Sequence, residues 1–402
     1  MVCDWSKKMI IKKKILLMEK IIENAKKLFA FPLPNPRISA ILTKSNTKNI
    51  IVEKNYEFYG DKHAERKIID EIKEKFSYII DDKIECDLYI NLEPCSHFGN
   101  NPPCCVGITD SLINIKNVFI PFLDIDEKVR GNGINHLKAN GIKVINGGFV
   151  DECYDVNEDF IYNRYTNKPL ITIKWAASLD GKIANDKNES KWITLDKTRM
   201  FANHLRNNFQ AIMVGGNTLN FDNPKLNIRD NPNPYNITKI IVSSLGKINY
   251  KNAIFLDQSN KIILATTENI DKEELKKAKN FGLDIILTKP TLDGKVDLIE
   301  LIELLGKKGI ASIMVEGGGE LFLSLIKYNL VNKIIAFVGA KILSGNKNSL
   351  INKSIFDNIE NSLNLKLTKV VPIENDVAIF YDTMEYYNTK KIIKKIIEYK
   401  GK

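Results

Sequence analysis

Two short stretches concentrate the side chains best able to bind a metal. Residues 93–105 read EPCSHFGNNPPCC and place Cys95 and Cys104 nine positions apart, and the upstream stretch HAE contains His63 and Glu65. The whole chain of 402 residues holds four histidines and six cysteines, so this concentration indicates a common purpose. Zinc favours histidine nitrogen and cysteine sulfur, and catalytic zinc sites keep a fourth position for water. We therefore predict that His63, Cys95 and Cys104 bind one Zn2+ ion per chain.

Glu65 is the candidate catalytic residue of this cluster. It stands two residues after His63, at the expected start of a helix, so its carboxylate lies near the metal without being a ligand. There it can take a proton from water on the metal and deliver it to a leaving nitrogen. Zinc deaminases carry the pattern H-x-E followed by P-C-x-x-C. Here the second cysteine follows nine residues after the first, not three.

Other interpretations of the cluster stay open at this point. Cys105 can replace Cys104 as a ligand, and His97 or Cys105 can complete a closed structural zinc site. Buried cysteines with no metal are a third interpretation. The catalytic interpretation is favoured because Glu65 has no task in a closed site.

Together, HAE, LEPCSHFGNNPPCC and the upstream PNP resemble the deaminase domain of the bifunctional riboflavin-biosynthesis deaminase/reductase family. The insertion SHFGNNPP distinguishes this family from other cytidine-deaminase-like enzymes. The resemblance implies hydrolysis of the exocyclic amine of 2,5-diamino-6-(5-phosphoribosylamino)pyrimidin-4(3H)-one. It also implies that Asn35 hydrogen-bonds the substrate ring and that Ser96 and His97 lie beside the substrate. Taken alone, Asn35 is equally a turn former between two prolines.

The chain departs from that family at four positions near this site. Arg37 and Ile38 follow PNP where the family has a small apolar pair, and Lys54 and Tyr56 stand where it commonly has Gly and His. Gly60 is retained. We expect the four departures to lie at the edge of the pocket and to leave the metal ligands intact.

The second half contains a glycine turn, in the stretch SIMVEGGGELFLSLI. It has the order strand, turn, helix, and free N–H groups at such a helix start can bind phosphate. A tight connection without a ligand accounts for the three glycines equally well. The fingerprint G-x-G-x-x-G is absent, which disfavours a Rossmann fold.

With VEGGGEL, the stretches IKWAASLDGKIA, ESKWIT and GGNTLNFDNPKLNIR resemble the reductase half of the same family. The resemblance implies a dihydrofolate-reductase-like fold, NADPH as cofactor and reduction of the ribosyl chain to 5-amino-6-(5-phosphoribitylamino)uracil. It implies substrate contacts from Ser190, Arg206, Leu226, Arg229 and Glu316. It implies NADPH contacts from Ala176, Trp192, Thr218, Asp222, Ser244, Gly318 and Gly319, and it implies that Lys174 orients the ribose.

Simpler roles exist for several of these residues. Trp192 and Leu226 can be core residues, and Arg206 and Arg229 can be solvated surface arginines. Asn217 and Asn227 replace residues that the family usually has, and we expect both replacements to be tolerated.

The candidate residues lie in a sequence whose hydrophobic pattern alternates between that of helices and that of strands. Between 15 and 148 we expect helices and strands that build a three-layer α/β domain of the cytidine-deaminase-like class, over residues 1–160. Its helices are expected at 15–29, 64–76, 106–115 and 134–140, and its strands at 37–43, 86–92, 117–124 and 142–148. A helical stretch at 151–167 leads to the boundary, placed between 150 and 168.

The alternation then restarts, which predicts a second α/β domain over 168–382 with a largely parallel sheet. Strands are expected at 170–176, 211–216, 239–244, 261–267, 284–288, 312–318, 333–339 and 377–382, and helices at 296–309 and 319–330. Residues 383–402 are expected to form a lysine-rich amphipathic tail.

The composition and charge of the chain limit the kinds of molecule that it is expected to bind. The net charge of +10 arises from 59 basic and 49 acidic residues, and the lysines are dispersed apart from runs at the two ends. We therefore expect a small phosphorylated pyrimidine as substrate and neither nucleic acid nor membrane as partner, in the cytoplasm. The oligomeric state stays open, a homo-oligomer included. The rival interpretations are a deaminase of nucleic-acid bases and a non-catalytic zinc module fused to a reductase.

Overall fold

The computed structural model describes residues 2–97, 102–187, 189–229, 237–257, 261–345, 348–351 and 353–399, with side chains from Lys14 onward. The chain forms two compact units. The first comprises Met1–Thr166 with Lys391–Lys402, and the second comprises Asn167–Lys390.

The first unit is built on five strands, namely β1 (Ser39–Lys44), β2 (Ile50–Asn55), β3 (Cys86–Ile90), β4 (Ile115–Ile120) and β5 (Lys143–Asn146). They lie in the order β2-β1-β3-β4-β5. β1 pairs antiparallel with β2 and β3, whereas β3, β4 and β5 are parallel to one another. The central β3 is buried along its whole length, including Asp87, and its sequence CDLYI is otherwise mostly apolar.

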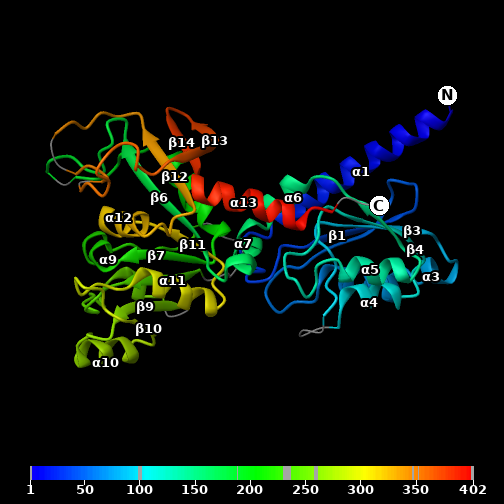
Figure 1. Ribbon diagram of the computed structural model, residues 1–402, viewed down its shortest axis with the longest axis horizontal. Helices are drawn as coiled ribbons and strands as arrows, with labels where there is room; N and C mark the ends of the chain where they lie inside the picture. Colours follow the sequence, from blue (N-terminus) through cyan, green and yellow to red (C-terminus); the bar gives the residue numbers. More distant parts are fainter. Residues whose placement is uncertain are drawn as a thin grey trace. The chain divides into compact units, whose positions relative to one another are not determined.

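Helices cover both faces of this sheet (Figure 1). They are α1 (Val2–Lys26), α2 (Ala64–Lys75), α3 (Tyr78–Asp81), α4 (Cys104–Thr109), α5 (Asn132–Ala139), α6 (Val150–Val156) and α7 (Glu158–Thr166). Leu17, Met18 and Ile21 of α1 are buried, which confirms the expected amphipathic helix. The helix expected over 106–115 was misplaced: α4 begins at Cys104 and ends at Thr109. Leu112 then takes a left-handed conformation (φ 64°), which the helix cannot continue through.

The second unit contains a nine-stranded sheet in the order β10-β9-β8-β7-β11-β6-β12-β14-β13. The strands are β6 (Leu170–Ser178), β7 (Ala211–Gly215), β8 (Thr238–Val242), β9 (Ile262–Thr267), β10 (Asp284–Thr288), β11 (Ser312–Val315), β12 (Lys333–Gly339), β13 (Leu365–Ile373) and β14 (Asp376–Thr383). All pairs from β10 to β12 are parallel, and only β14 and β13 add antiparallel pairs. The sequence patterns above do not predict β13, an edge strand whose side chains are mostly exposed.

The helices of this unit connect the parallel strands (Figure 1). They are α8 (Asp196–His204), α9 (Gly216–Asp222), α10 (Lys272–Asn280), α11 (Leu298–Lys307) and α12 (Gly319–Lys327), with short 3-10 turns at Leu205–Asn208 and Ala253–Phe255. The largest core cluster described in this unit packs strand residues against apolar side chains of α11 and α12; the strand residues are Ile171 and Ile173 of β6, Ala211 and Met213 of β7, and Ile313 and Val315 of β11.

The segment 383–402, expected as a basic tail, is largely the helix α13 (Met384–Ile397). Its isoleucines recur every three to four residues, and Ile393 and Ile397 are fully buried. Beyond the helix, Glu398 forms an isolated bridge with Phe122, and the Tyr399 carbonyl accepts a hydrogen bond from Asn146 at 2.5 Å. The end of the chain is therefore an integral part of the first unit.

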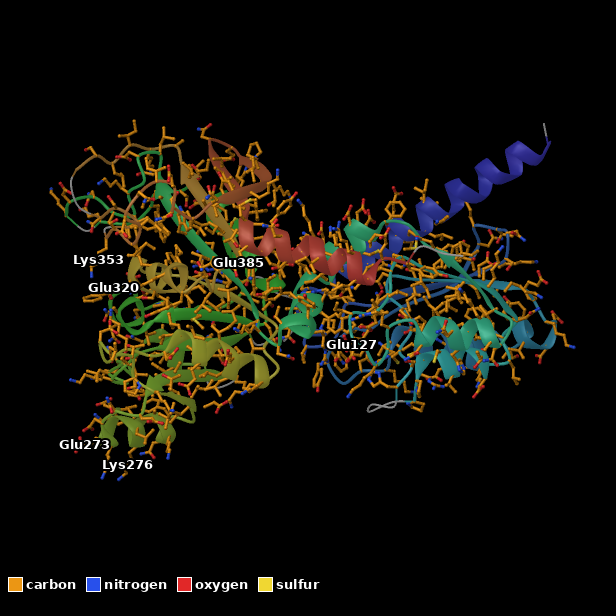
Figure 2. The ribbon with its side chains drawn as sticks, viewed as in Figure 1. Glu127, Glu273, Lys276, Glu320, Lys353 and Glu385 are labelled. Atoms are coloured by element: carbon orange, nitrogen blue, oxygen red, sulfur yellow. The ribbon has the colours of Figure 1, made fainter. Side chains whose placement is uncertain are left out.

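Charged side chains are distributed over the surface with both signs mixed. Glu273, Lys276 and Glu320 are examples that point away from the core (Figure 2). Within the described residues, no helix combines the length and the apolar character needed to cross a membrane.

Candidate functional site

Helix starts and a strand end bring the predicted zinc ligands together. His63 is the residue before α2, Cys104 is the first residue of α4, and Cys95 follows the end of the buried strand β3. Glu65 lies in the first turn of α2. The starts of α2 and α4 meet beside the loop that follows β3. His63 and Cys104, 41 positions apart in the chain, therefore lie next to each other and to Cys95.

The geometry of these three residues fits a zinc ion. His63 Nδ1 lies 3.2 Å from Cys104 Sγ and 3.7 Å from Cys95 Sγ, and the three ligand atoms all lie within 4.8 Å of one another. Tetrahedral ligands about 2.0–2.3 Å from zinc are about 3.3–3.8 Å apart, which these distances match. The alternative ligand Cys105 and the exposed His97 do not belong to this group, within the part of the chain that the structure describes.

The two cysteines differ in their protonation. Hydrogen bonding from Cys104 lowers the pKa of Cys95 to about 4, with His63 contributing in the same direction and burial opposing. The same hydrogen bond, together with burial, raises the pKa of Cys104 well above its usual value. Without a metal the thiolate of the pair is therefore on Cys95, whereas a bound zinc ion takes both sulfurs as thiolates.

Glu65 carries a buried polar atom without a partner. Its side chain is 4% exposed, and its Oε2 atom has no hydrogen-bond partner among the described residues. Burial raises the pKa of Glu65, and the nearby His63 counteracts this only in part. A buried unpaired carboxylate oxygen is costly. Its position beside the ligand group therefore indicates a functional task.

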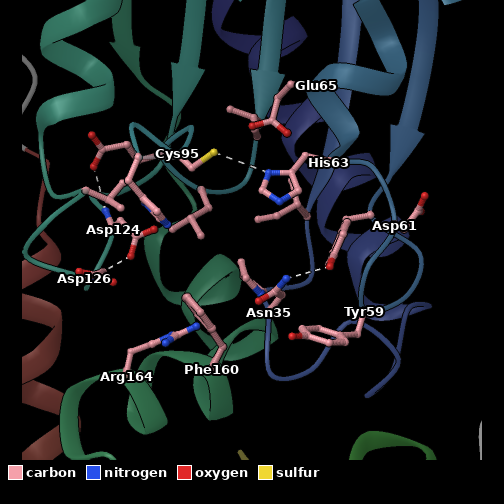
Figure 3. A pocket seen from close by; sticks show the side chains of 18 of the residues that line it. Asn35, Tyr59, Asp61, His63, Glu65, Cys95, Asp124, Asp126, Phe160 and Arg164 are labelled. Carbon is pink, nitrogen blue, oxygen red and sulfur yellow. Dashed lines mark hydrogen bonds between the residues drawn. The ribbon is translucent and has the colours of Figure 1, made fainter. Parts of the chain in front are cut away.

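His63, Glu65 and Cys95 form one end of a cavity of about 330 Å3 in the first unit (Figure 3). Asn35 lines this cavity, and its amide donates a hydrogen bond to the Tyr56 hydroxyl at 2.8 Å. His97 also lines it, whereas the half-buried Ser96 does not appear among the lining residues. The structure thus brings Asn35 and His97, both expected near the substrate, into the same cavity as His63 and Glu65.

The four departures from the family pattern lie in two different environments. Ile38 and Tyr56 line the cavity, as expected. The expectation was wrong for Arg37 and Lys54. Arg37 is 6% exposed and makes a bidentate ion pair with Asp159, at 2.6 and 2.8 Å. Lys54 pairs with Glu71 on α2. Neither residue lines the cavity, and each is paired with a carboxylate.

Several lining residues were not identified from the sequence. Asp61, Asp124, Phe160 and Arg164 all contribute to the cavity. Phe160 and Arg164 belong to α7, which comes after β5 in the chain and packs beside the cavity in the folded protein. Their only signal in the sequence was an amphipathic helical pattern, which does not reveal a pocket.

Three candidate residues of the second unit, Thr218, Ser244 and Glu316, follow the carboxyl ends of neighbouring parallel strands, and Lys174 lies in the middle of a fourth. Lys174 lies in β6, Thr218 in α9 after β7, Ser244 just after β8, and Glu316 directly after β11. Ligands in open parallel sheets bind at this edge. The pairing of Ile173 with Val315 brings Lys174 beside Glu316.

Lys174, Arg206 and Glu316 form a buried charged cluster. Arg206 donates from Nε to Glu316 Oε1 at 2.9 Å and from Nη2 to Oε2 at 3.0 Å, and Lys174 Nζ lies 3.2 Å from Oε2. Burial alone would raise the pKa of Glu316, but Lys174 and Arg206 outweigh it and hold the pKa at about 2. The third guanidinium nitrogen of Arg206 donates to the Asn227 carbonyl at 2.6 Å. Arg206 thus uses all three of its nitrogens within the protein.

The glycine turn lies against Thr218. Gly317 has a φ of 106°, and a Cβ there would come within 2.7 Å of the Thr218 side chain. The Gly318 N–H donates to Thr218 Oγ1 at 3.0 Å, and a Cβ at Gly319 would clash with the Leu350 carbonyl. The turn leads into α12, whose N-cap Gly318 has no side-chain capping bond. A narrow glycine cradle before a helix start fits the phosphate groups of a dinucleotide such as NADPH.

The remaining candidates differ in exposure. Ser190, Trp192, Asp222 and Arg229 are exposed, and Trp192 at 57% is not a core residue. Ala176 and Ser244 are half-buried. Leu226 is 3% exposed and packs in the core of the second unit, so its side chain is unavailable to a ligand and only its backbone can contact one.

Lys239 was not identified from the sequence. This lysine is fully buried within the apolar strand β8, and its Nζ donates to Asn227 Oδ1 at 2.7 Å. Asn227, identified above only as a departure, therefore connects Lys239 to Arg206. A lysine in the middle of TKIIV was the available signal.

Both halves of the chain match known family models. Residues 11–120 match the cytidine and deoxycytidylate deaminase zinc-binding region, and residues 169–379 match the RibD C-terminal domain. The riboflavin biosynthesis protein RibD of Buchnera aphidicola is 33% identical over 384 residues, covering 91% of this chain and 98% of that protein. The RibD protein of Actinobacillus pleuropneumoniae is 31% identical over 367 residues, covering 90% and 94%.

Solved structures agree over both units. Acinetobacter baumannii RibD superimposes with a TM-score of 0.79 at 24% identity, covering 93% of this chain and 99% of that one. A deaminase/reductase from Thermotoga maritima gives a TM-score of 0.78 at 26% identity, covering 92% and 99%. The chain therefore belongs to the RibD family of riboflavin biosynthesis enzymes, with a zinc-binding deaminase domain followed by a reductase domain.

Proposed function

We propose that the first unit deaminates 2,5-diamino-6-(5-phosphoribosylamino)pyrimidin-4(3H)-one and that the second unit reduces the ribosyl chain of the product with NADPH. The product is 5-amino-6-(5-phosphoribitylamino)uracil. The observation that carries the first step is the unpartnered Glu65 carboxylate oxygen beside the His63, Cys95 and Cys104 group. A small phosphorylated substrate and a cytoplasmic location belong to the same proposal.

In the deaminase pocket, His63, Cys95 and Cys104 hold zinc, which when bound acts as a Lewis acid that lowers the pKa of water. Glu65 receives the proton of the attacking water at its carboxylate and transfers it to the exocyclic nitrogen. The carbon–nitrogen bond breaks, a carbonyl replaces the amine, and ammonia leaves. Asn35, fixed by Tyr56, is positioned to orient the pyrimidine ring.

In the reductase, the chain's task is orientation, because NADPH supplies the hydride when bound. Glu316, held by Lys174 and Arg206, stays ionised and presents a fixed acceptor for substrate hydroxyls. The cradle at Gly317–Gly319 and Thr218 receives the cofactor. Ser190, Trp192, Asp222 and Arg229 are exposed and remain candidates for contact with substrate or cofactor.

A coupled assay tests this function. The purified chain is given the diaminopyrimidine substrate with and without NADPH, and both products are followed by mass. We expect ammonia release in both cases and the ribityl product only with NADPH. A chain that binds zinc but releases no ammonia would be the non-catalytic zinc module, and activity on single-stranded DNA or RNA alone would favour a nucleic-acid deaminase.

A further inference from the structure

The deaminase cavity is strongly acidic. Besides Glu65, its lining includes Asp61, Glu93, Asp124 and Asp126. Among the described residues that line it, Arg164 is the only arginine or lysine. A phosphorylated substrate that enters such a cavity is repelled by the carboxylates unless a cation binds its phosphate.

The acidic groups already have partners inside the protein. Asp61 pairs with Lys67. Glu93 accepts the N–H groups of Asp124, Gly131 and Ile134 at 3.0, 2.9 and 3.2 Å. These carboxylates therefore shape the cavity and do not need a ligand.

Arg164, in contrast, has an exposed side chain whose guanidinium N–H groups are available to a ligand. It lies in the last turn of α7, and its guanidinium carbon lies 5.7 Å from the centre of the Phe160 ring. It forms no ion pair with any carboxylate in the part of the chain described. The positive charge of Arg164 acts to lower the pKa of Asp124, but the Asp124 carboxylate accepts its hydrogen bond from the Asp126 N–H, at 2.9 Å. Two neighbouring arginines have partners inside the protein: Arg37 pairs with Asp159, and Arg130 donates to the backbone carbonyls of Asp124 and Ile125.

The position of Arg164 matches the far end of a bound substrate. In Figure 3, Arg164 and Phe160 lie at the opposite end of the cavity from Glu65 and Cys95. A molecule whose amine lies at Glu65 then extends its ribosyl phosphate toward Arg164. Arginine suits this task because its planar N–H groups pair with phosphate oxygens.

We propose that Arg164 binds the phosphate of the deaminase substrate and makes this pocket selective for the phosphorylated compound. The inference rests on the proposed deaminase function and names the group that recognises one part of its substrate. Arg164 is a binding residue and takes no part in proton transfer.

The test compares Arg164→Met with the parent on two substrates, the phosphorylated pyrimidine and the same compound without its phosphate. Loss of a charge-assisted hydrogen bond predicts a rise of about 10- to 150-fold in KM for the phosphorylated substrate. We expect kcat, zinc content and reduction of the separately supplied deaminated intermediate to stay unchanged. The two proteins are expected to deaminate the phosphate-free compound equally, and Arg164→Lys to recover part of the loss.

Ribose 5-phosphate provides a binding readout. It is expected to inhibit deamination by the parent competitively and to inhibit Arg164→Met much more weakly, whereas ribose inhibits neither. The matched control is Lys73→Met, which removes one exposed positive charge of the same unit outside the cavity. An unchanged KM in Arg164→Met, or an equal rise for both substrates, would overturn the proposal while the deaminase function stands. A parent that releases no ammonia would refute the function itself.

Discussion

The two sites of this chain treat their buried charges in opposite ways. In the deaminase pocket, Glu65 keeps an unpartnered carboxylate oxygen next to three ligand atoms. In the reductase, Glu316 is equally buried, but Lys174 and Arg206 satisfy it from both sides. Under the proposed function, the first arrangement leaves a carboxylate oxygen available to a proton, and the second holds Glu316 as a fixed charge that orients a ligand. Substitutions should therefore affect the two sites through different quantities.

The largest expected effect is at the metal ligands. Cys95→Ser removes the thiolate and should abolish both zinc binding and deamination, while NADPH binding and reduction continue in the second unit. Metal analysis of the purified variant, together with both half-reactions, checks this outcome. Undiminished zinc in the variant would remove the ligand assignment.

Glu65→Gln tests the proton shuttle with the metal site intact. The amide keeps the shape of the side chain but cannot take up the proton, and loss of general acid–base help typically costs about 10²–10⁴ in rate. Zinc content should match the parent. If this variant deaminates at the parental rate, the proton passes through another group.

The reductase cluster should respond more moderately and in a graded way. Arg206→Ala leaves Glu316 with Lys174 alone and frees the Asn227 carbonyl, and lost charge-assisted bonds of about 1.5–3 kcal/mol predict a 10- to 150-fold fall in reductase kcat/KM. Deamination should continue, so the deaminated intermediate accumulates.

Arg229→Ala is the matched comparison for Arg206→Ala, because the Arg229 side chain is exposed and its backbone N–H alone is fixed, by Asn203 at 2.7 Å. Reduced reductase activity with unchanged thermal stability would mark Arg229 as a ligand contact. Unchanged reduction would leave it a surface arginine. A parallel fall of both half-reactions in Arg206→Ala would indicate lost folding.

The smallest expected effect concerns Lys239 and the pH dependence of stability. Burial lowers the pKa of Lys239 from 10.5 to about 8, with the charge of Arg206 adding to this and Asp257 opposing. Between pH 8 and 10.5 the unfolded chain then binds more protons at this lysine than the folded chain. The free energy of unfolding should therefore rise with pH in this window relative to Lys239→Met. Urea denaturation of both proteins at pH 7.5 and 9.5 measures the difference, and parallel behaviour of the two would contradict the shifted pKa.

The candidate zinc ligands of the deaminase could be predicted from the sequence because they lie in two short motifs, with His63 and Cys104 at helix starts and Cys95 in the loop after β3. HAE and PPC each begin a helix, so local structure already fixes the direction of His63, Glu65 and Cys104. The largely parallel sheet of the second unit was predicted from the alternation of strand and helix patterns, and the turn before α12 was predicted from its three glycines. The order of the strands in that sheet was not predicted. The amphipathic character of α1 also followed from sequence spacing alone.

Only the tertiary structure decided which charges are free and which are consumed. Arg37 was expected at the pocket edge, but Asp159, 122 residues away, pairs with it and buries it. Arg206 was expected to contact the substrate, and the structure shows that its guanidinium already pairs with Glu316, 110 residues away in the chain. Arg164 belongs to no sequence motif. It lines the cavity because of the way α7 packs within the first unit. The physical reason is that an ionised side chain pairs with the opposite charge nearest to it in space. The separation of two residues in the sequence does not give that distance.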